Sequence, residues 1–237
     1  MLKNRVIPTL LIKDGGLVKT TNFKSHKYVG DPINAVKIFN EKEVDELIIL
    51  DIDASRFSKE PNYSLIEQFA GECFMPLCYG GGVNSIKQAR EIFSLGVEKI
   101  SIQTACYENT NIIKELAQQF GNQSIVTSLD IKKNWRGKYL LYSSKEKKTV
   151  DTPWLDFLRT VVNLGTGEVL INSVDRDGTL SGVEIELIRD ACNSVDIPII
   201  ASGGVRGLND IKSAIGAGAS AVAAGSFFVF TGPHRAV

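Results

Sequence analysis

The sequence predicts a single (β/α)8 barrel, the TIM-barrel fold, built from two related halves. A chain of 237 residues is an ordinary length for one such barrel, and we expect one domain over residues 1–237. Short β-branched runs alternate with longer helical patterns, as in parallel strands joined by helices. Residues 80–104 also align with residues 202–226 without a gap, at a constant offset of 122. A repeat of about half the chain indicates a two-fold barrel and not a solenoid.

Eight runs of mostly apolar residues follow one another as strand candidates. Nearly continuous apolar runs are expected for parallel strands that are covered on both faces. The expected strands are residues 6–11, 47–52, 75–79, 100–104, 125–131, 169–174, 197–201 and 221–225. The first of them covers the apolar start of the chain, which lacks the cleavage site of a signal peptide.

Seven helical patterns separate these strands, near residues 32–42, 62–71, 84–95, 109–120, 153–165, 183–194 and 208–217. Asn84 and Asn109 are expected N-caps, and Gly96, Gly121 and Gly218 are expected helix ends. Only seven residues follow Phe230, too few for a full eighth helix. A short stub or a partner protein must therefore cover the last strand.

Two long segments follow strands one and five, and so lie at the C-terminal face, where barrels of this kind carry their chemistry. Residues 13–31 are expected to form a long polar loop. Residues 132–151 are expected to form a small hairpin that turns at Arg136 and Gly137. The lysines of this second segment are equally compatible with a plain solvated loop.

Composition excludes several classes of function. The chain has 27 basic and 27 acidic residues, so it shows no overall nucleic-acid footprint, and no apolar run reaches transmembrane length. We expect a cytoplasmic protein. The four cysteines form no C-x-x-C pair and are expected to be reduced thiols. The two histidines, His26 and His234, lack metal-ligand spacing, and neither a metal nor another cofactor is expected.

Two glycine pairs in equivalent positions of the repeat predict phosphate binding. Gly81-Gly82 and Gly203-Gly204 each follow a strand and open a helix, where backbone N–H groups can approach an anion closely. Thr104 and Ser226, at the ends of the next strands, add hydroxyl donors, and Asp175–Thr179 forms a further glycine turn. Two such sites predict a substrate with a phosphate at each end. A purely structural turn is the alternative.

Five carboxylates end strands at the expected mouth of the barrel, where a tuned pKa would allow them to move protons. Asp130, at the end of a buried strand, is the strongest candidate. Asp53 and Asp175 could equally cap a loop or pair with a lysine. The remaining two are Asp51 and Asp177.

A quieter pattern lies at the opposite end of the barrel. Four charged residues each come directly before a strand and alternate in sign, and they could close into a ring of ion pairs. They are Arg5, Glu46, Lys99 and Glu168. Such a ring is usually only a solvated edge. At the axis of a barrel it could instead plug or gate a passage.

Together these residues resemble the cyclase subunit of imidazole glycerol phosphate synthase over essentially the whole chain. The matching stretches are KDGG-LVKTTNF (13–23), GDPINAV (30–36), DELIILDID (45–53), GGGVNS (80–85), EKISIQTA (98–105), SLD (128–130), DRDGT-LSG (175–182), PIIASGG (198–204) and AGASAVAAGS (217–226). The resemblance implies that a glutaminase subunit of the class I amidotransferase type docks on the N-terminal face. Ammonia would then pass through the barrel to a bis-phosphorylated substrate at the C-terminal face.

The resemblance also implies roles for single residues. It assigns Gly82 and Thr104 to one phosphate, and Gly178, Gly204 and Ser226 to the other. Lys19 matches the mobile first loop of the family. The four charges at the base, Arg5, Glu46, Lys99 and Glu168, match the gate at the ammonia entrance.

One departure from the family pattern concerns catalysis. The cyclase uses two aspartates; the second is Asp130, but the first falls at Leu11, which cannot move a proton. Losing one member of an acid–base pair typically costs about 10²–10⁴-fold in rate. Gln103 replaces an asparagine common in the family's phosphate site, and the chain ends in the short tail GPHRAV.

These departures resemble the branch of the family associated with acetamidino sugars of surface polysaccharides, whose members are thought to pass ammonia to a separate sugar amidotransferase. An active histidine-pathway cyclase remains the alternative, with Asp130 making both proton transfers or Asp51 assisting. A non-catalytic scaffold that binds a phosphorylated ligand and activates its partner is the third. A sister isomerase of the same pathway fits the motifs less well.

Overall fold

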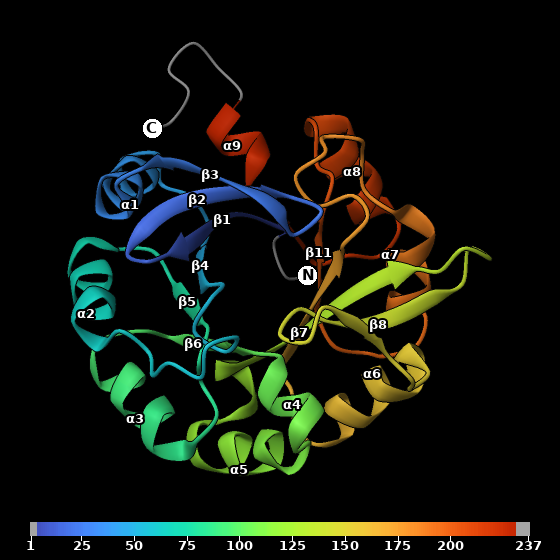
Figure 1. Cartoon of the computed structure of the whole chain (residues 1–237), viewed down its shortest axis with the longest axis horizontal. Coiled ribbons are helices and arrows are strands. Elements are labelled where there is room, and N and C mark those ends of the chain that lie inside the picture. Colours follow the sequence, from blue (N-terminus) through green and yellow to red (C-terminus); the bar gives the residue numbers. More distant parts are fainter. Residues whose placement is uncertain (1–3, 231–237) are drawn as a thin grey trace.

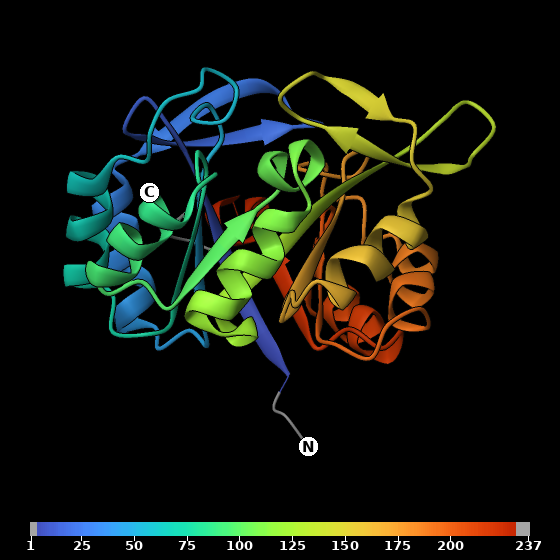
Figure 2. The same ribbon diagram turned by 90° about the horizontal axis from the view of Figure 1, so that it is seen from below.

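The computed structural model describes residues 4–230 and has the predicted barrel (Figures 1 and 2). Eight parallel strands form the closed sheet, and β12 pairs back with β1. In order around the barrel the strands are β1 (Arg5–Lys13), β4 (Leu47–Asp51), β5 (Leu77–Gly80), β6 (Lys99–Ile102), β7 (Ile125–Lys133), β10 (Glu168–Ser173), β11 (Ile199–Ser202) and β12 (Ala221–Ala224). All eight strand predictions are confirmed, with ends shifted by a few residues.

Helices surround this ring of strands (Figure 1). They are α1 (Pro32–Glu41), α2 (Tyr63–Glu72), α3 (Ile86–Ser94), α4 (Thr104–Glu108), α5 (Asn111–Phe120), α6 (Trp154–Asn163), α7 (Ile185–Cys192), α8 (Leu208–Gly216) and α9 (Ser226–Phe230). Each long helix buries one apolar stripe against the strands; in α5 this stripe includes Ile112, Ile113 and Leu116. None of the helices within residues 4–230 is long and apolar enough to cross a membrane.

Both expected N-caps are wrong by one residue: they are Ser85 and Thr110, not Asn84 and Asn109. The N-cap of α3 is Ser85, whose hydroxyl accepts a hydrogen bond from the Gln88 N–H, and not Asn84. Asn109 ends α4 instead of starting α5, because α4 is a separate short helix that the sequence pattern did not reveal. The expected helix end at Gly121 is confirmed as the C-cap of α5.

The first long segment is a hairpin, so its prediction as a polar loop is wrong. Strands β2 (Gly16–Thr21) and β3 (Lys24–Gly30) pair antiparallel, and β2 also pairs with the extended end of β1. The run Leu17–Thr20 is buried and supplies the β-forming residues, whereas β3 is polar and largely exposed. The hairpin lies over the C-terminal end of the barrel (Figure 2).

The second long segment is the predicted hairpin with one further strand. β8 (Tyr139–Ser143) returns along β7, and β9 (Lys148–Val150) follows it. At the other end of the chain, α9 is the expected stub beside the last strand. The Phe228 ring packs edge-on against Phe39 of α1, with ring centroids 5.8 Å apart. His234 and the tail GPHRAV lie outside the described residues.

The interior of the barrel is apolar. A cluster of fully or nearly fully buried side chains comes from seven of the eight barrel strands, all but β6, as in the packed interiors of other barrels of this type. Its members are Ile7, Ile48, Cys78, Val126, Leu170, Ile200, Ala221 and Ala223. A second, larger core lies between the strands and the helices. The inner cluster therefore separates the two ends of the barrel, which carry the polar residues considered next.

Candidate functional site

A cavity of about 400 Å³ opens at the C-terminal ends of the strands. Its floor includes Thr9, Leu50 and Leu170, and both hairpins contribute to its walls through Phe23 and Tyr142. The rings of these two aromatic residues lie 6.2 Å apart, so the β2–β3 hairpin and β8 meet over the mouth. Cavities at this end of a (β/α)8 barrel are the usual place for ligand binding.

Asp130 lies in this cavity and is only 6% exposed. Its two carboxylate oxygens accept hydrogen bonds from amide groups on the neighbouring strands. Gln103 Nε2 donates over 2.7 Å and Asn172 Nδ2 over 3.1 Å. Burial raises the pKa of Asp130 to about 7, although both hydrogen bonds oppose the rise. A carboxyl with this pKa can both take up and release a proton near neutral pH.

Leu11 lines the same cavity from β1, opposite Leu50 of β4, and adds no group that can move a proton. Asp51 also lines it, but one of its oxygens accepts the backbone N–H groups of Asp53 and Ala54, 3.1 Å away in each case. Burial raises the pKa of Asp51. Asp51 is thus in the cavity and also caps the loop after β4.

Two of the candidate carboxylates have the structural role given as the alternative. Asp53 forms an ion pair with Lys13 at the end of β1. Asp175 accepts a hydrogen bond of 2.7 Å from the backbone N–H of Lys133 and so ties the loop after β10 to β7. Neither arrangement leaves a free carboxylate at the mouth.

Lys19 and Asp177 are two further titratable groups at the mouth whose charges influence one another. Lys19 is 4% exposed, and its Nζ donates to the backbone oxygen of Thr9 over 2.7 Å. Burial lowers the pKa of Lys19 to about 8, while the charge of Asp177 works in the other direction. Burial also raises the pKa of Asp177 to about 6, and the Thr20 hydroxyl donates to its carboxylate. Both groups therefore titrate closer to neutrality than usual.

The first glycine turn opens on the large cavity. Gly81 and Gly82 have φ angles of +118° and +75°, which favour glycine. A Cβ on Gly81 would lie 2.4 Å from the backbone oxygen of Asp51, so no other residue fits there. The Gly82 N–H donates to the hydroxyl of Ser55 over 3.2 Å. Thr104, at the start of α4, lines the same cavity.

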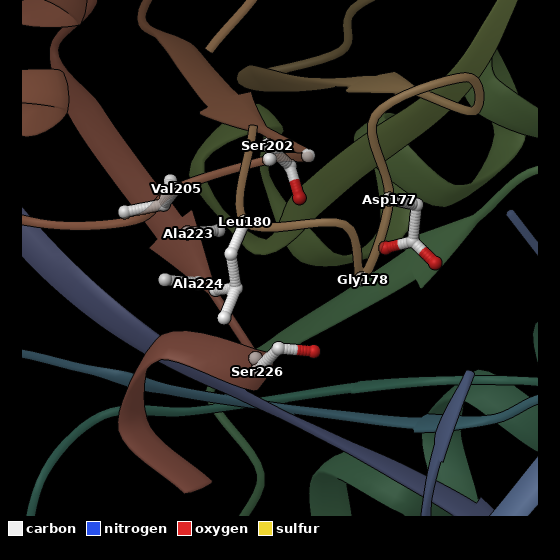
Figure 3. Close-up of a pocket in the computed structure, with 11 residues that line it drawn as sticks. Asp177, Gly178, Leu180, Ser202, Val205, Ala223, Ala224 and Ser226 are labelled. Carbon is white, nitrogen blue, oxygen red and sulfur yellow. The ribbon is translucent and has the colours of Figure 1, made fainter. Parts of the chain in front are cut away.

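The second glycine turn lines a smaller hollow of about 30 Å³, shown in Figure 3. Gly178, Gly204 and Ser226 meet there, as the sequence predicts. The Leu180 side chain, which no motif singled out, occupies the hollow beside Ser226 (Figure 3). Asp177 lines this hollow and also the large cavity, so the two glycine turns share one mouth.

The charged residues at the base form the predicted closed ring of ion pairs. Glu46 contacts both cations, with Lys99 at 3.0 Å, and Glu168 contacts Arg5 at 3.1 Å and Lys99 at 3.2 Å. The side chain of Glu46 is 2% exposed, and those of the other three are 13–21% exposed. This is more burial than a surface edge would give. The ring closes the N-terminal end of the inner apolar cluster.

Sequence reasoning missed two side chains beside Asp130. Asn172 lies inside a strand candidate, and nothing in the local pattern shows that it points toward Asp130. Ser144 comes from the β8–β9 turn, and its hydroxyl donates to Gln103 Oε1 over 2.8 Å. Both contacts join residues about 40 positions apart in the chain, so only the tertiary fold reveals them.

These features define the class of protein: a two-fold (β/α)8 barrel whose mouth carries side chains that titrate near neutral pH and whose base carries a closed ring of charges. A family model described as "Histidine biosynthesis protein" matches residues 5–233. The chain therefore belongs to the histidine biosynthesis protein family, as a HisF-like member, and the resemblance seen in the sequence is confirmed.

Curated relatives support the same placement. One, from Pseudomonas aeruginosa, is named "Putative imidazole glycerol phosphate synthase subunit hisF2" and is 50% identical, covering 100% of this chain and 95% of the relative. Another, from Vibrio vulnificus, is named "Putative imidazole glycerol phosphate synthase subunit hisF3" and is 47% identical, covering 100% and 92%. A third, from Leptospira borgpetersenii, is named "Putative imidazole glycerol phosphate synthase subunit HisF" and is 48% identical, covering 100% and 94%.

Proposed function

We propose that this chain is the barrel subunit of a glutamine-dependent amidotransferase complex in the cytoplasm. A class I glutaminase subunit docks on the N-terminal face and supplies ammonia, which passes through the barrel. The nitrogen is delivered to a separate sugar amidotransferase that makes the acetamidino group of a surface-polysaccharide sugar. The observation that carries this proposal is the buried ring of Arg5, Glu46, Lys99 and Glu168 below a mouth that keeps Asp130 but has Leu11.

The base of the barrel has the properties of a partner surface. Phe74, in the loop that leads into β5, is 86% exposed beside the N-terminal ends of the strands. Exposed aromatic side chains are typical anchors of protein interfaces. The relatives named as synthase subunits support the presence of a partner. A glutaminase docked here would release ammonia directly at the charged ring.

The route from base to mouth crosses the inner apolar cluster. Most of these side chains are aliphatic, but Cys78, Ala221 and Ala223 are small. A neutral molecule of the size of ammonia can pass between such side chains when they move, whereas an ion would pay a large desolvation cost. The cluster thus favours passage of neutral ammonia over leakage of ammonium or water.

The mouth supports binding of a phosphorylated small molecule. The turns at Gly82 and Gly204 open on one shared mouth, which Thr104 and Ser226 also line, and glycine turns of this kind bring the backbone close to an anion. Asp130 is the acid–base group of this site. With Leu11 in place of its partner, we propose that the bound molecule orders the mouth for ammonia delivery and that ring closure has been lost.

The direct test is ammonia transfer in the assembled complex. Lys99→Ala should leave glutamine hydrolysis running but lower the nitrogen that reaches the acceptor by about tenfold, because the ring no longer controls the entrance. Lys37→Ala, which removes an exposed ion pair with Glu72, is the matched control and should transfer normally. Unchanged transfer in Lys99→Ala would refute the gate assignment.

An active cyclase of histidine biosynthesis is the second candidate. It is favoured by the raised pKa of Asp130 and by the presence of both glycine turns. Complementation of a histidine-requiring strain that lacks its cyclase separates the two functions, and growth would overturn the sugar assignment. The Leu11→Asp variant extends the test. If it restores growth where the natural chain fails, the mouth still accepts the substrate of the cyclase.

A further inference from the structure

A chain of hydrogen bonds connects the β8–β9 turn to Asp130. The Ser144 hydroxyl donates to Gln103 Oε1 over 2.8 Å, and Gln103 Nε2 donates to Asp130 Oδ2 over 2.7 Å. All three residues line the large cavity. Asn172 completes the arrangement from the other side through its 3.1 Å bond to Asp130 Oδ1. The carboxylate therefore receives one amide donor on each oxygen.

The ionised Asp130 carboxylate only accepts hydrogen bonds and so selects the NH₂ end of the Gln103 amide, while the Ser144 hydroxyl holds the carbonyl end of the same amide. A side-chain amide has an acceptor oxygen and a donor NH₂ group, and rotation by 180° exchanges them. With Ser144 donating to Oε1, the NH₂ group is the end that faces Asp130. In the reversed orientation two acceptors would face one another, and Asp130 could keep the contact only by holding a proton.

We infer that Ser144 is a positioning residue that anchors the carbonyl end of the Gln103 amide, keeps its NH₂ group within reach of Asp130 and thereby stabilises the ionised form of Asp130. Ser144 does not contact the carboxylate itself; it acts through Gln103. The inference rests on the proposed function only in giving Asp130 an acid–base role. The hydrogen-bond chain and its effect on the proton affinity of Asp130 stand without that role.

Other ionisable groups face Asp130 but do not replace this donor. Asp177, from the loop after β10, adds a like charge, which raises the pKa of Asp130 as burial does. Tyr107 from α4 and Tyr142 from β8 also lie near the carboxylate, and burial raises the pKa of both phenols, so they stay neutral near pH 7. The other titratable residues of the cavity wall are Lys24, His26, Asp51, Asp53, Arg56, Lys132 and Lys147.

The position of Ser144 links this effect to the cover of the mouth. Ser144 directly follows β8, whose Tyr142 contacts Phe23 in the β2–β3 turn. Movement of β8 away from the mouth would withdraw the hydroxyl from Gln103. The anchoring of Gln103 therefore depends on β8 staying in its place at the mouth.

Carboxyl-carbon NMR titration of the full chain, labelled with ¹³C at its aspartate carboxyls, tests this directly. The Asp130 resonance is assigned with the Asp130→Asn variant. Ser144→Ala should raise the Asp130 pKa by about one, the usual effect of losing a hydrogen bond to the charged form. Ser144→Thr keeps the hydroxyl and should restore the natural value to within about 0.3.

Two further variants separate positioning from general loosening of the hairpin. The Ser143 hydroxyl accepts the Glu146 N–H in the same turn and does not touch Gln103, so Ser143→Ala should leave the Asp130 pKa unchanged. In a Gln103→Leu background, Ser144→Ala should add no further shift. The inference fails if Ser144→Ala leaves the pKa unchanged or if its shift persists without Gln103. Neither result depends on ammonia transfer, so failure of the proposed function is seen separately.

Discussion

The two ends of the barrel treat buried charge in opposite ways. At the base, Glu46 and its three partners neutralise one another in a closed ring. At the mouth, Asp130, Asp177 and Lys19 are buried with incomplete compensation, and their pKa values move to about 7, 6 and 8. Mutual pairing keeps groups charged, whereas desolvation brings them close to their titration points. The base is therefore suited to an electrostatic closure, and the mouth to proton transfer.

Breaking the ring should have the largest effect on stability. Glu46→Ala leaves Arg5 and Lys99 facing one another with only Glu168 between them, and removing one partner of a buried ion pair typically costs about 3–5 kcal/mol. Glu72→Ala removes an exposed pair with Lys37 and should cost less than about 1 kcal/mol. Urea unfolding at neutral pH measures both. Equal costs would show that the ring is only a solvated edge.

Removing the buried charge of Asp130 at the mouth should instead increase the free energy of unfolding at neutral pH. The folded pKa of Asp130, about 7, lies above the unfolded value of about 4, so the folded state holds a proton that the unfolded chain has lost. Stability therefore falls as pH rises from about 4 to 7, and the loss is complete above pH 7. Asp130→Asn lacks this dependence, so its stability relative to the natural chain should rise by about 2.5 kcal/mol between about pH 5 and pH 8.

Urea unfolding of both proteins at the two pH values gives this difference. Asp177 remains in both chains, so most of its own pH dependence is common to the two proteins. Parallel pH dependences would show that Asp130 is not desolvated as its position indicates. They would also remove the contrast between the two ends of the barrel.

The smallest expected effect comes from changing an exposed aromatic residue at either end of the barrel. Phe74 at the base and Trp135 beyond the end of β7 at the mouth are almost equally exposed, at 86% and 85%. Phe74→Ser should weaken glutaminase binding by about tenfold, as for an interface anchor, whereas Trp135→Ser should not change it. Isothermal titration of the two subunits measures this. Neither change should alter the unfolding free energy of the free barrel by more than about 0.5 kcal/mol. If Trp135→Ser weakened binding and Phe74→Ser did not, the partner would have to bind at the mouth and not at the base.

The barrel and both ends of its axis could be predicted from the sequence because their signals are local or repeated. Glycine pairs at a constant offset mark equivalent turns, and a charge directly before each of four strands places those charges at one end. The pairing within the ring then follows from sign and proximity. The parallel strands also determine that Asp130 ends a buried strand at the mouth.

The missed features depend on contacts between distant parts of the chain. β3, Lys24–Gly30, is a polar strand whose pairing comes from β2, so its own composition indicates a loop. Asn172 contacts Asp130 because β10 lies beside β7, and Ser144 contacts Gln103 because the turn after β8 folds back over the mouth. The Lys13 partner of Asp53 was foreseen only as an alternative, since no pattern distinguishes a paired carboxylate from a free one.

The apolar cluster between the two ends has a consequence for charge transport. Those eight side chains form a thin layer of low polarity between the two polar ends of the barrel. A charged species would lose its hydration on entering this layer, so only a neutral molecule crosses it at low cost. Under the proposed function, ammonium would have to release its proton at the base, and nitrogen transfer should slow as the pH falls.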